Sequence, residues 1–280
     1  MNRRNALTII PTAFATAAAA ACSGYGGPAP ARPLAYDVPT PPMATFHMTD
    51  TMVVTISTPM GDMAVNNGTD LTLAMTFERA AEGVRVMGSV EHFEASSENP
   101  MMGTQSIDGD DVSGTLEYVI GRRGDVEVTS LPELPAAAAQ MSPFASLARE
   151  LLPPLPDAVV EPGGMWVDTV TWTADIESME TTSTGILTYT LVGDTLVEGR
   201  TLLNLAVSGE VSADAEGSVA GMAMTQTMAG STTGFILWDA ERGLPAYQES
   251  ESEMEGSMSA AGMPPFSMMV TGTTTVTLRN

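Results

Sequence analysis

No lysine occurs in the chain, and all 11 of its basic residues are arginine. This absence excludes Schiff-base chemistry, lysine general bases and the lysine of a phosphate-binding loop. The 34 acidic residues outnumber the arginines, so the formal net charge is −23 at pH 7. Because nucleic acid and anionic lipid headgroups attract dense positive charge, we expect no nucleic-acid partner and no electrostatic adhesion to a membrane.

Cysteine and aromatic residues are also scarce. The single cysteine, Cys22, leaves no second thiol with which an intramolecular disulfide could form. Aromatic residues make up 5% of the chain, whereas 21 residues are methionine. We therefore expect a core filled by methionine, leucine and valine rather than by aromatic rings.

Residues suited to catalysis are few. Only two histidines are present, His47 and His92, and no Gly-x-Ser-x-Gly turn that would expose a nucleophilic serine occurs. His92 lies near Glu91 and Glu94 on a predicted strand, where an exposed histidine is a simpler interpretation than an acid–base catalyst. We expect neither an enzyme nor a cofactor.

The N-terminal residues have the pattern of an export signal. Arg3 and Arg4 precede an apolar stretch, residues 6–21, which ends in three alanines directly before Cys22. A charged start, a short apolar run and small residues before a cleavage site are typical of secretion signals. The position of the cysteine resembles that in a bacterial lipoprotein precursor, and the resemblance implies removal of residues 1–21 and acylation of Cys22.

Two alternatives to the lipoprotein interpretation remain open. Cys22 could be incidental in an ordinary signal peptide, because Ala19 stands where lipoprotein precursors usually have leucine, or the arginine pair could belong to a twin-arginine export signal. A membrane-spanning helix is excluded, since the stretch is shorter than about 20 residues and contains Pro11. Ser23 follows the cysteine, and the lipoprotein resemblance then implies a lipid-anchored protein of the cell envelope that is permitted to reach the outer membrane.

Residues 22–46 are rich in proline and glycine. Proline fixes φ and lacks an N–H, so such a segment is unsuited to a sheet ladder or to the interior of a helix. We expect it to be a tether that begins with the lipidated cysteine and leads to a single β-rich domain, residues 47–280.

Apolar and polar residues alternate along much of this domain. Met52, Val54 and Ile56 share one parity, and the period of two predicts strands. Tight turns are predicted at Asn66–Thr69, where asparagine and glycine accept a positive φ, and at Gly121–Gly124.

One helix is predicted between two β halves. Apolar residues recur at helical spacing from Phe144 to Leu152, after a Ser-Pro pair that suits a helix start and before a Pro-Pro pair that ends one. The sequence thus predicts an amphipathic helix near 142–152 that bridges halves of about 47–130 and 165–280.

The strands predicted after this helix are longer than the usual five or six residues, and long antiparallel strands wrap into curved sheets. We therefore predict a mainly β fold, with long antiparallel strands forming a curved half-barrel or barrel and one short amphipathic helix. The predicted late strands are Met165–Ala174, Thr184–Val192, Arg200–Ala213, Ser218–Trp238, Leu244–Met258 and Ser267–Leu278.

Two late motifs carry a family resemblance. Residues 156–166 have the pattern Pro-x-x-x-Val-x-Pro-Gly-x-x-Trp, and Trp238-Asp239 is followed by Arg242-Gly243-Leu244 in a predicted closing hairpin with its turn at Asp239–Gly243. Both resemble segments of uncharacterised β-rich bacterial lipoprotein families. The layout of long curved strands with a short helix is similar to that of the carriers that ferry lipoproteins across the periplasm.

Methionines gather on the late strands. Met222, Met224 and Met228 share one parity, and Met254 and Met258 share one parity on the next predicted strand. We predict that these five residues line a concave apolar face that binds a hydrophobic ligand, because flexible methionine adapts to varied shapes. A packed core without a ligand and a Cu(I) site built from thioethers are the alternatives.

Acidic residues form two patterns. A row of glutamates at every second position, from Glu249 to Glu255, places four carboxylates on one face of a strand, which we interpret as the solvent side. Asp108–Asp111 is interpreted as a solvated turn, with a calcium site as the alternative.

Together these features predict a membrane-anchored, non-enzymatic protein that binds a hydrophobic ligand in a β half-barrel. The alternative is a structural or interaction lipoprotein of the cell envelope that has a closed core and engages a protein partner. Membrane contact is expected through the acyl anchor alone.

Overall fold

The computed structural model shows one curved, unclosed sheet of 12 antiparallel strands with very little helix. This confirms the predicted fold class. The segment proposed as the signal, residues 1–21, and Cys22 lie outside the described part of the chain. The structure describes residues 34–58, 61–101, 103–109, 112–134, 144–176, 179–219, 222–260, 262 and 264–279.

The strands are long, and each late strand overlaps a run predicted from the sequence, although most extend beyond it. Several reach 17–20 residues, about three times the usual length. The elements are β1 (Met43–Thr58), β2 (Gly61–Ala80), β3 (Gly83–Asn99), β4 (Gly103–Asp108), β5 (Leu116–Ile120), β6 (Val126–Ser130), α2 (Phe144–Leu151), β7 (Met165–Ile176), β8 (Met179–Val197), β9 (Arg200–Val219), β10 (Met222–Asp239), β11 (Leu244–Ala260) and β12 (Phe266–Arg279).

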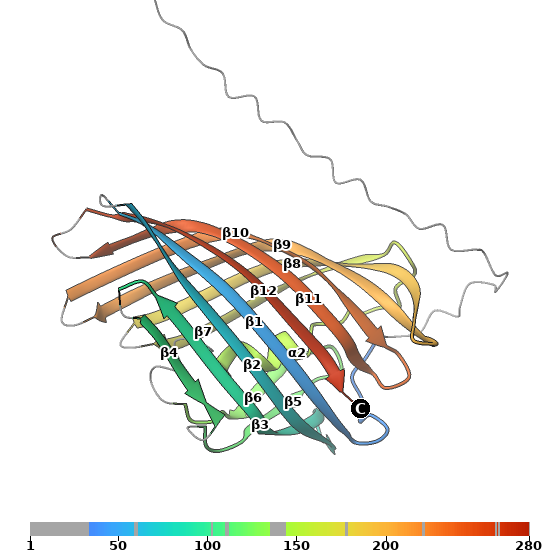
Figure 1. The fold of residues 1–280 in the computed structure, drawn as a ribbon. Coiled ribbons are helices and arrows are strands. Elements are labelled where there is room, and N and C mark those ends of the chain that lie inside the picture. The colour runs from blue at the N-terminus through green and yellow to red at the C-terminus, as the bar shows by residue number, and fades with distance from the viewer. Residues whose placement is uncertain are drawn as a thin grey trace, which may run out of the picture. The chain divides into compact units, whose positions relative to one another are not determined.

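The first and last strands of the domain join its two halves into one sheet. β1 pairs with β2 on one side and with β12 on the other, so the order is β6-β5-β3-β2-β1-β12-β11-β10-β9-β8-β7, and β4 pairs with β3. In Figure 1 the blue β1 accordingly runs beside the red β12. The pairing places Phe46 opposite Leu278 and Asp50 opposite Thr274. Strands from both halves therefore form one continuous inner face.

The period of two along the strands separates an apolar inner face from a polar outer face. Ala44, Phe46 and Met48 on β1 are buried, while the residues between them are only partly buried. The register keeps this parity from strand to strand, so that Phe46 also faces Leu73 of β2. Buried residues of one parity thus collect on the concave side and form the core.

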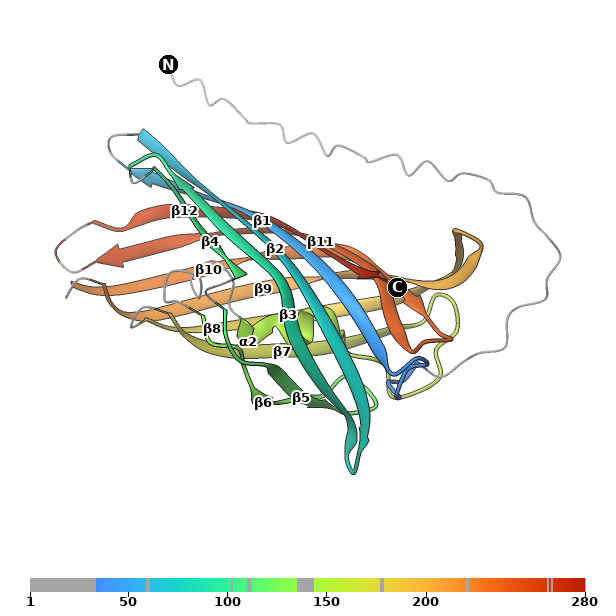
Figure 2. The same ribbon diagram turned by 60° about the horizontal axis from the view of Figure 1, so that its bottom comes forward.

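The helix α2 packs against this concave side, inside the curve of the sheet (Figures 1 and 2). Its buried residues Phe144, Leu147, Ala148 and Leu151 recur at the spacing of one helical face. At its end, the Gln248 side chain on β11 donates a hydrogen bond to the Leu151 carbonyl over 2.9 Å. The predicted helix is confirmed, although the Ser-Pro pair expected to start it lies outside the described residues.

The prediction that residues 22–46 form a tether is wrong for its last part. Leu34 and Tyr36 are buried, and the edge of the Tyr36 ring meets Trp238 with 5.2 Å between ring centroids. The strand β1 already begins at Met43. Proline prevents a ladder in this segment, but it does not prevent side chains from entering the core. Only residues 22–33 keep the tether interpretation as a prediction.

The turn predicted at Asn66–Thr69 is also wrong. These residues lie inside the 20-residue strand β2, where Asn67 is paired with Met52 on one side and with Ser97 on the other. Asparagine and glycine permit a tight turn but do not require one. Hydrogen bonding to strands on both sides keeps the segment extended.

Two other predicted turns are confirmed. Between β5 and β6, the Gly124 N–H donates to the Gly121 carbonyl over 3.1 Å. Between β10 and β11, the Asp239 carboxylate accepts hydrogen bonds from the backbone N–H groups of Glu241 and Arg242 at 3.0 and 3.1 Å. A carboxylate that satisfies backbone donors in this way fixes the turn.

Glycines in mid-strand allow the sheet to bend. A Cβ added at Gly230 would collide with the Glu253 carbonyl on the neighbouring strand, and one added at Gly256 would collide with that of Thr227. Only glycine permits backbones to approach in this way, and glycine kinks of this kind introduce curvature. Both glycines have the inner parity, so they lie on the concave side.

The covered part of the concave face should dominate stability. Leu205 is fully buried there, whereas Leu196 is 73% exposed on the neighbouring strand. We expect Leu205→Ala to lower the free energy of unfolding by roughly 2–5 kcal/mol, because it removes buried methyl groups and leaves a cavity. Leu196→Ala should change it by less than about 0.5 kcal/mol. Urea unfolding followed by circular dichroism measures both, and equal losses would contradict this account.

Candidate functional site

The helix is too short to cover the concave face. Its eight residues span about 12 Å, whereas the 20 residues of β9 extend over roughly 66 Å. A groove of about 410 Å³ remains between the C-terminal end of α2 and the inner face of β7–β12. Arg149, Glu150, Pro153 and Pro154 form the wall on the helix side. The helix therefore fills one part of the concave side and leaves another part open.

The floor of the groove is mainly apolar. Trp172 comes from β7, Tyr189 from β8, Val207 from β9 and Met254 from β11. Tyr189 also stacks on Trp166 with 5.4 Å between ring centroids and 11° between ring planes. Burial is the main cause that raises the pKa of the Tyr189 phenol, so the phenol stays neutral.

Trp166 links this floor to the wall. Its Nε1–H donates a hydrogen bond to the Pro154 carbonyl over 3.3 Å. This is the tryptophan that ends the Pro-x-x-x-Val-x-Pro-Gly-x-x-Trp motif, and it lies at the start of β7, as the sequence predicts. The motif therefore attaches the segment after the helix to the edge of the sheet.

Hydroxyl groups interrupt the apolar floor. Ser183, Thr232 and Ser252 line the groove, as does Thr274, whose hydroxyl donates a hydrogen bond of 2.6 Å to the Asp50 carboxylate. Burial raises the pKa of the Asp50 carboxyl above its ordinary value, and the bond from Thr274 opposes that rise. A ligand in the groove would therefore meet both apolar surface and hydrogen-bonding groups.

The five predicted methionines all have the inner parity, but they do not all line the groove. Met254 is part of its floor. Met228 is buried, Met224 and Met258 are half-buried further along the same face, and Met222 is 45% exposed at the start of β10. The structure thus brings four of them together on the concave side and places one of them in the groove.

Sequence reasoning missed the other groove residues. Trp172 and Tyr189 both have the inner parity of their predicted strands, and this parity is the signal that could have identified them. Nothing in the sequence marks Arg149, because its position at the groove depends on how the helix docks on the sheet.

The two histidines meet on the outer face. The Nε2 atoms of His47 and His92 lie 3.0 and 3.7 Å from Asp70 Oδ1, on three adjacent strands. His92 is half-exposed, in agreement with the predicted strand histidine. Among the described residues, no group of three or more His, Cys, Asp or Glu side chains is arranged to hold a metal ion. Two of the four residues of the alternative calcium turn, Asp110 and Asp111, lie outside the described part.

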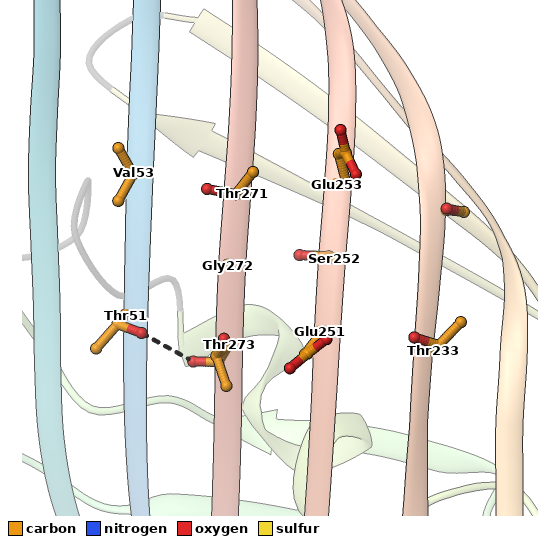
Figure 3. Close-up of a pocket in the computed structure, with 10 residues that line it drawn as sticks. Thr51, Val53, Thr233, Glu251, Ser252, Glu253, Thr271, Gly272 and Thr273 are labelled. Atoms are coloured by element: carbon orange, nitrogen blue, oxygen red, sulfur yellow. Dashed lines mark hydrogen bonds between the residues drawn. The ribbon is translucent and has the colours of Figure 1, made fainter. Parts of the chain in front are cut away.

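The outer face is polar, as the glutamate row predicts. It has a depression of about 340 Å³, where Glu251 and Glu253 lie beside Thr271 and Thr273 (Figure 3). Both glutamates are exposed. Because threonine, serine and glutamate make up most of its lining, this depression is a weaker candidate for a hydrophobic ligand than the groove.

Comparison with known proteins leaves the groove as the main guide to function. No protein-family model matches the chain, and no curated protein matches its sequence. Within the ranges that the structure describes, no helix has the length and apolar character needed to cross a bilayer.

The Asp50 carboxyl should make stability depend on pH. Its raised pKa means that the folded state holds the proton more tightly than the unfolded state, whose value is near 3.8. The stabilisation from the Asp50 carboxyl is therefore complete below pH 3.8, and it is lost as the pH rises through the pKa of the folded state. We expect Asp50→Asn to raise the urea midpoint at pH 7, with the gain shrinking toward pH 3.

Asp62→Asn is the matched control, because Asp62 is exposed near the start of β2. The difference between the urea midpoint of Asp62→Asn and that of the natural protein should not change with pH. A loss of stability in Asp50→Asn at pH 7 would mean that the charged carboxylate is needed by the fold.

Proposed function

We propose that this protein binds a hydrophobic ligand in the groove without catalysing a reaction. The observation that carries the proposal is the open apolar floor beside α2. The volume of the groove, about 410 Å³, falls within the range of roughly 300–1,000 Å³ that small-molecule sites occupy. The floor combines aromatic, aliphatic and methionine side chains with a few hydroxyl groups, which is the usual composition of such sites.

The distribution of burial supports this proposal. In the core cluster that also contains the buried residues of α2, inner-face residues such as Phe46 and Leu205 are at most 1% exposed. Further along the same face, Met52, Val54 and Val270 are only half-buried. A concave face that exposes apolar side chains is typical of an interaction site. The layout of long curved strands with a short helix is also similar to that of periplasmic lipoprotein carriers, although a fold alone does not define a function.

Filling the groove should weaken binding. Ala213 lines the groove on β9, so Ala213→Trp would occupy its volume. We expect this variant to lose at least about tenfold in affinity for the neutral fluorescent probe N-phenyl-1-naphthylamine, because a ligand cannot share the space. Probe fluorescence in a titration of the purified protein provides the measurement.

The control for this variant is Ala229→Trp. Ala229 is exposed on the outer face of β10, and it is paired with Ser212, the neighbour of Ala213. It should bind the probe as tightly as the natural protein. Equal probe binding by both variants would exclude the groove as the site.

The same proposal includes a lipid anchor. We propose that Cys22 is acylated after removal of residues 1–21 and that the acyl chains hold the β domain at the membrane of a bacterial envelope. Stable anchoring needs more than one chain, because a single chain binds only marginally. The export pattern before Cys22 supports this address.

Metabolic labelling with radioactive palmitate tests the anchor. We expect the natural chain to incorporate label, and Cys22→Ser to lose it and to leave the membrane fraction. Ser23→Ala, with the thiol intact, should be labelled normally. Label retained in Cys22→Ser would place the acyl group elsewhere and contradict the lipoprotein address.

A second candidate function is the docking of a protein partner along β7. Among the described strands this one pairs with β8 alone, so its other edge has unpaired backbone groups. Met165 and Val167 on it are 69% and 62% exposed. An extended segment of another protein could add to such an edge. The two candidates are distinguishable, since the substitution at Ala213 would block the groove and leave this edge unchanged.

A further inference from the structure

Arg149 is a cation on the wall of the groove. It lies in the last turn of α2, it is half-buried, and its side chain has no hydrogen-bond or ion-pair partner among the described residues. By contrast, Arg79, Arg85, Arg123 and Arg200 each pair with a carboxylate. In a chain with 34 acidic residues, an arginine without an anion beside an apolar groove calls for an explanation.

The helix dipole explains only part of this arrangement. A cation in the last turn is favourable because the C-terminal carbonyls carry partial negative charge. Any exposed position of that turn would serve this purpose. The dipole does not account for a half-buried side chain that lines the same cavity as Trp172 and Tyr189.

On the basis of the proposed function, we propose that the ligand is an anionic amphiphile with a single chain, namely a long-chain carboxylic acid. Its carboxylate would pair with the Arg149 guanidinium, which matches the two oxygens with two parallel N–H groups. Its chain would lie on the floor between Trp172, Val207 and Met254. The modest volume of about 410 Å³ favours one chain over two.

One neighbouring acid bears on the charge of the preferred headgroup. Glu150, next to Arg149 in the chain, also lines the groove. It would repel a headgroup with two negative charges more strongly than one with a single charge. A monoanionic carboxylate therefore fits better than a phosphate monoester, and an uncharged headgroup makes no use of Arg149.

A competition experiment on the full-length protein tests this assignment. The experiment measures how well four compounds displace N-phenyl-1-naphthylamine: palmitate, hexadecanol, methyl palmitate and hexadecyl phosphate. It is carried out with the natural protein, Arg149→Gln and Arg149→Lys. We expect palmitate to bind the natural protein about 10- to 100-fold more tightly than hexadecanol, which is the usual contribution of a charged hydrogen bond. Arg149→Gln should lose this preference while binding hexadecanol unchanged, and Arg149→Lys should keep part of it.

Arg85→Gln is the control, because Arg85 lies on the outer face of β3 and pairs with Glu117. It should retain the full preference for palmitate. Equal binding of palmitate and hexadecanol by the natural protein would overturn the assignment and leave groove binding intact. Tighter binding of hexadecyl phosphate, or a loss of hexadecanol in Arg149→Gln, would also overturn it. If neither the probe nor any of the four compounds binds, the proposed function itself fails.

Discussion

The pairing of β1 with β12 is the constraint on which the rest of this structure depends. It joins residues more than 200 positions apart, as the hydrogen bond between Thr274 and Asp50 shows. Without it the strands would form two smaller sheets with additional unpaired edges, which are prone to aggregation. The pairing also makes the floor of the concave side continuous, so one helix can close part of it. Because such contacts are distant in sequence, we expect the sheet to fold slowly compared with a helical protein of this size.

The groove results from a mismatch between the sheet and the helix that covers it. Glycines such as Gly230 and Gly256 let the long strands bend, while α2 provides only two turns of apolar surface. Bending creates a volume that a helix of this length cannot fill. A longer helix would convert the same face into a closed core. The openness of the groove thus follows from the proline pair shortly after α2, at Pro153 and Pro154, as much as from the strands.

The sequence predicts the local structure of this protein better than its long-range contacts. Alternation around Val54, the helical spacing from Phe144 and the turn at Asp239 each depend on neighbouring residues, and all three are confirmed. The failures have the opposite character. The segment at Asn66–Thr69 looks like a turn until its partners on β1 and β3 are known, and Tyr36 looks like part of a tether until its contact with Trp238 is seen. The groove belongs to the same class, since Arg149 meets its floor only through the docking of the helix.

The strong negative charge of the body bears on how the groove can select an anion. At physiological ionic strength the charges on the outer face are screened within about 8 Å, so they repel a distant carboxylate only weakly. Inside the groove the apolar floor lowers the effective dielectric constant, and charge interactions there are stronger than at the surface. A single cation such as Arg149 can therefore decide the affinity for an anionic headgroup although acidic residues outnumber basic ones overall. Selectivity would arise from contact at short range, and long-range attraction would contribute nothing to it.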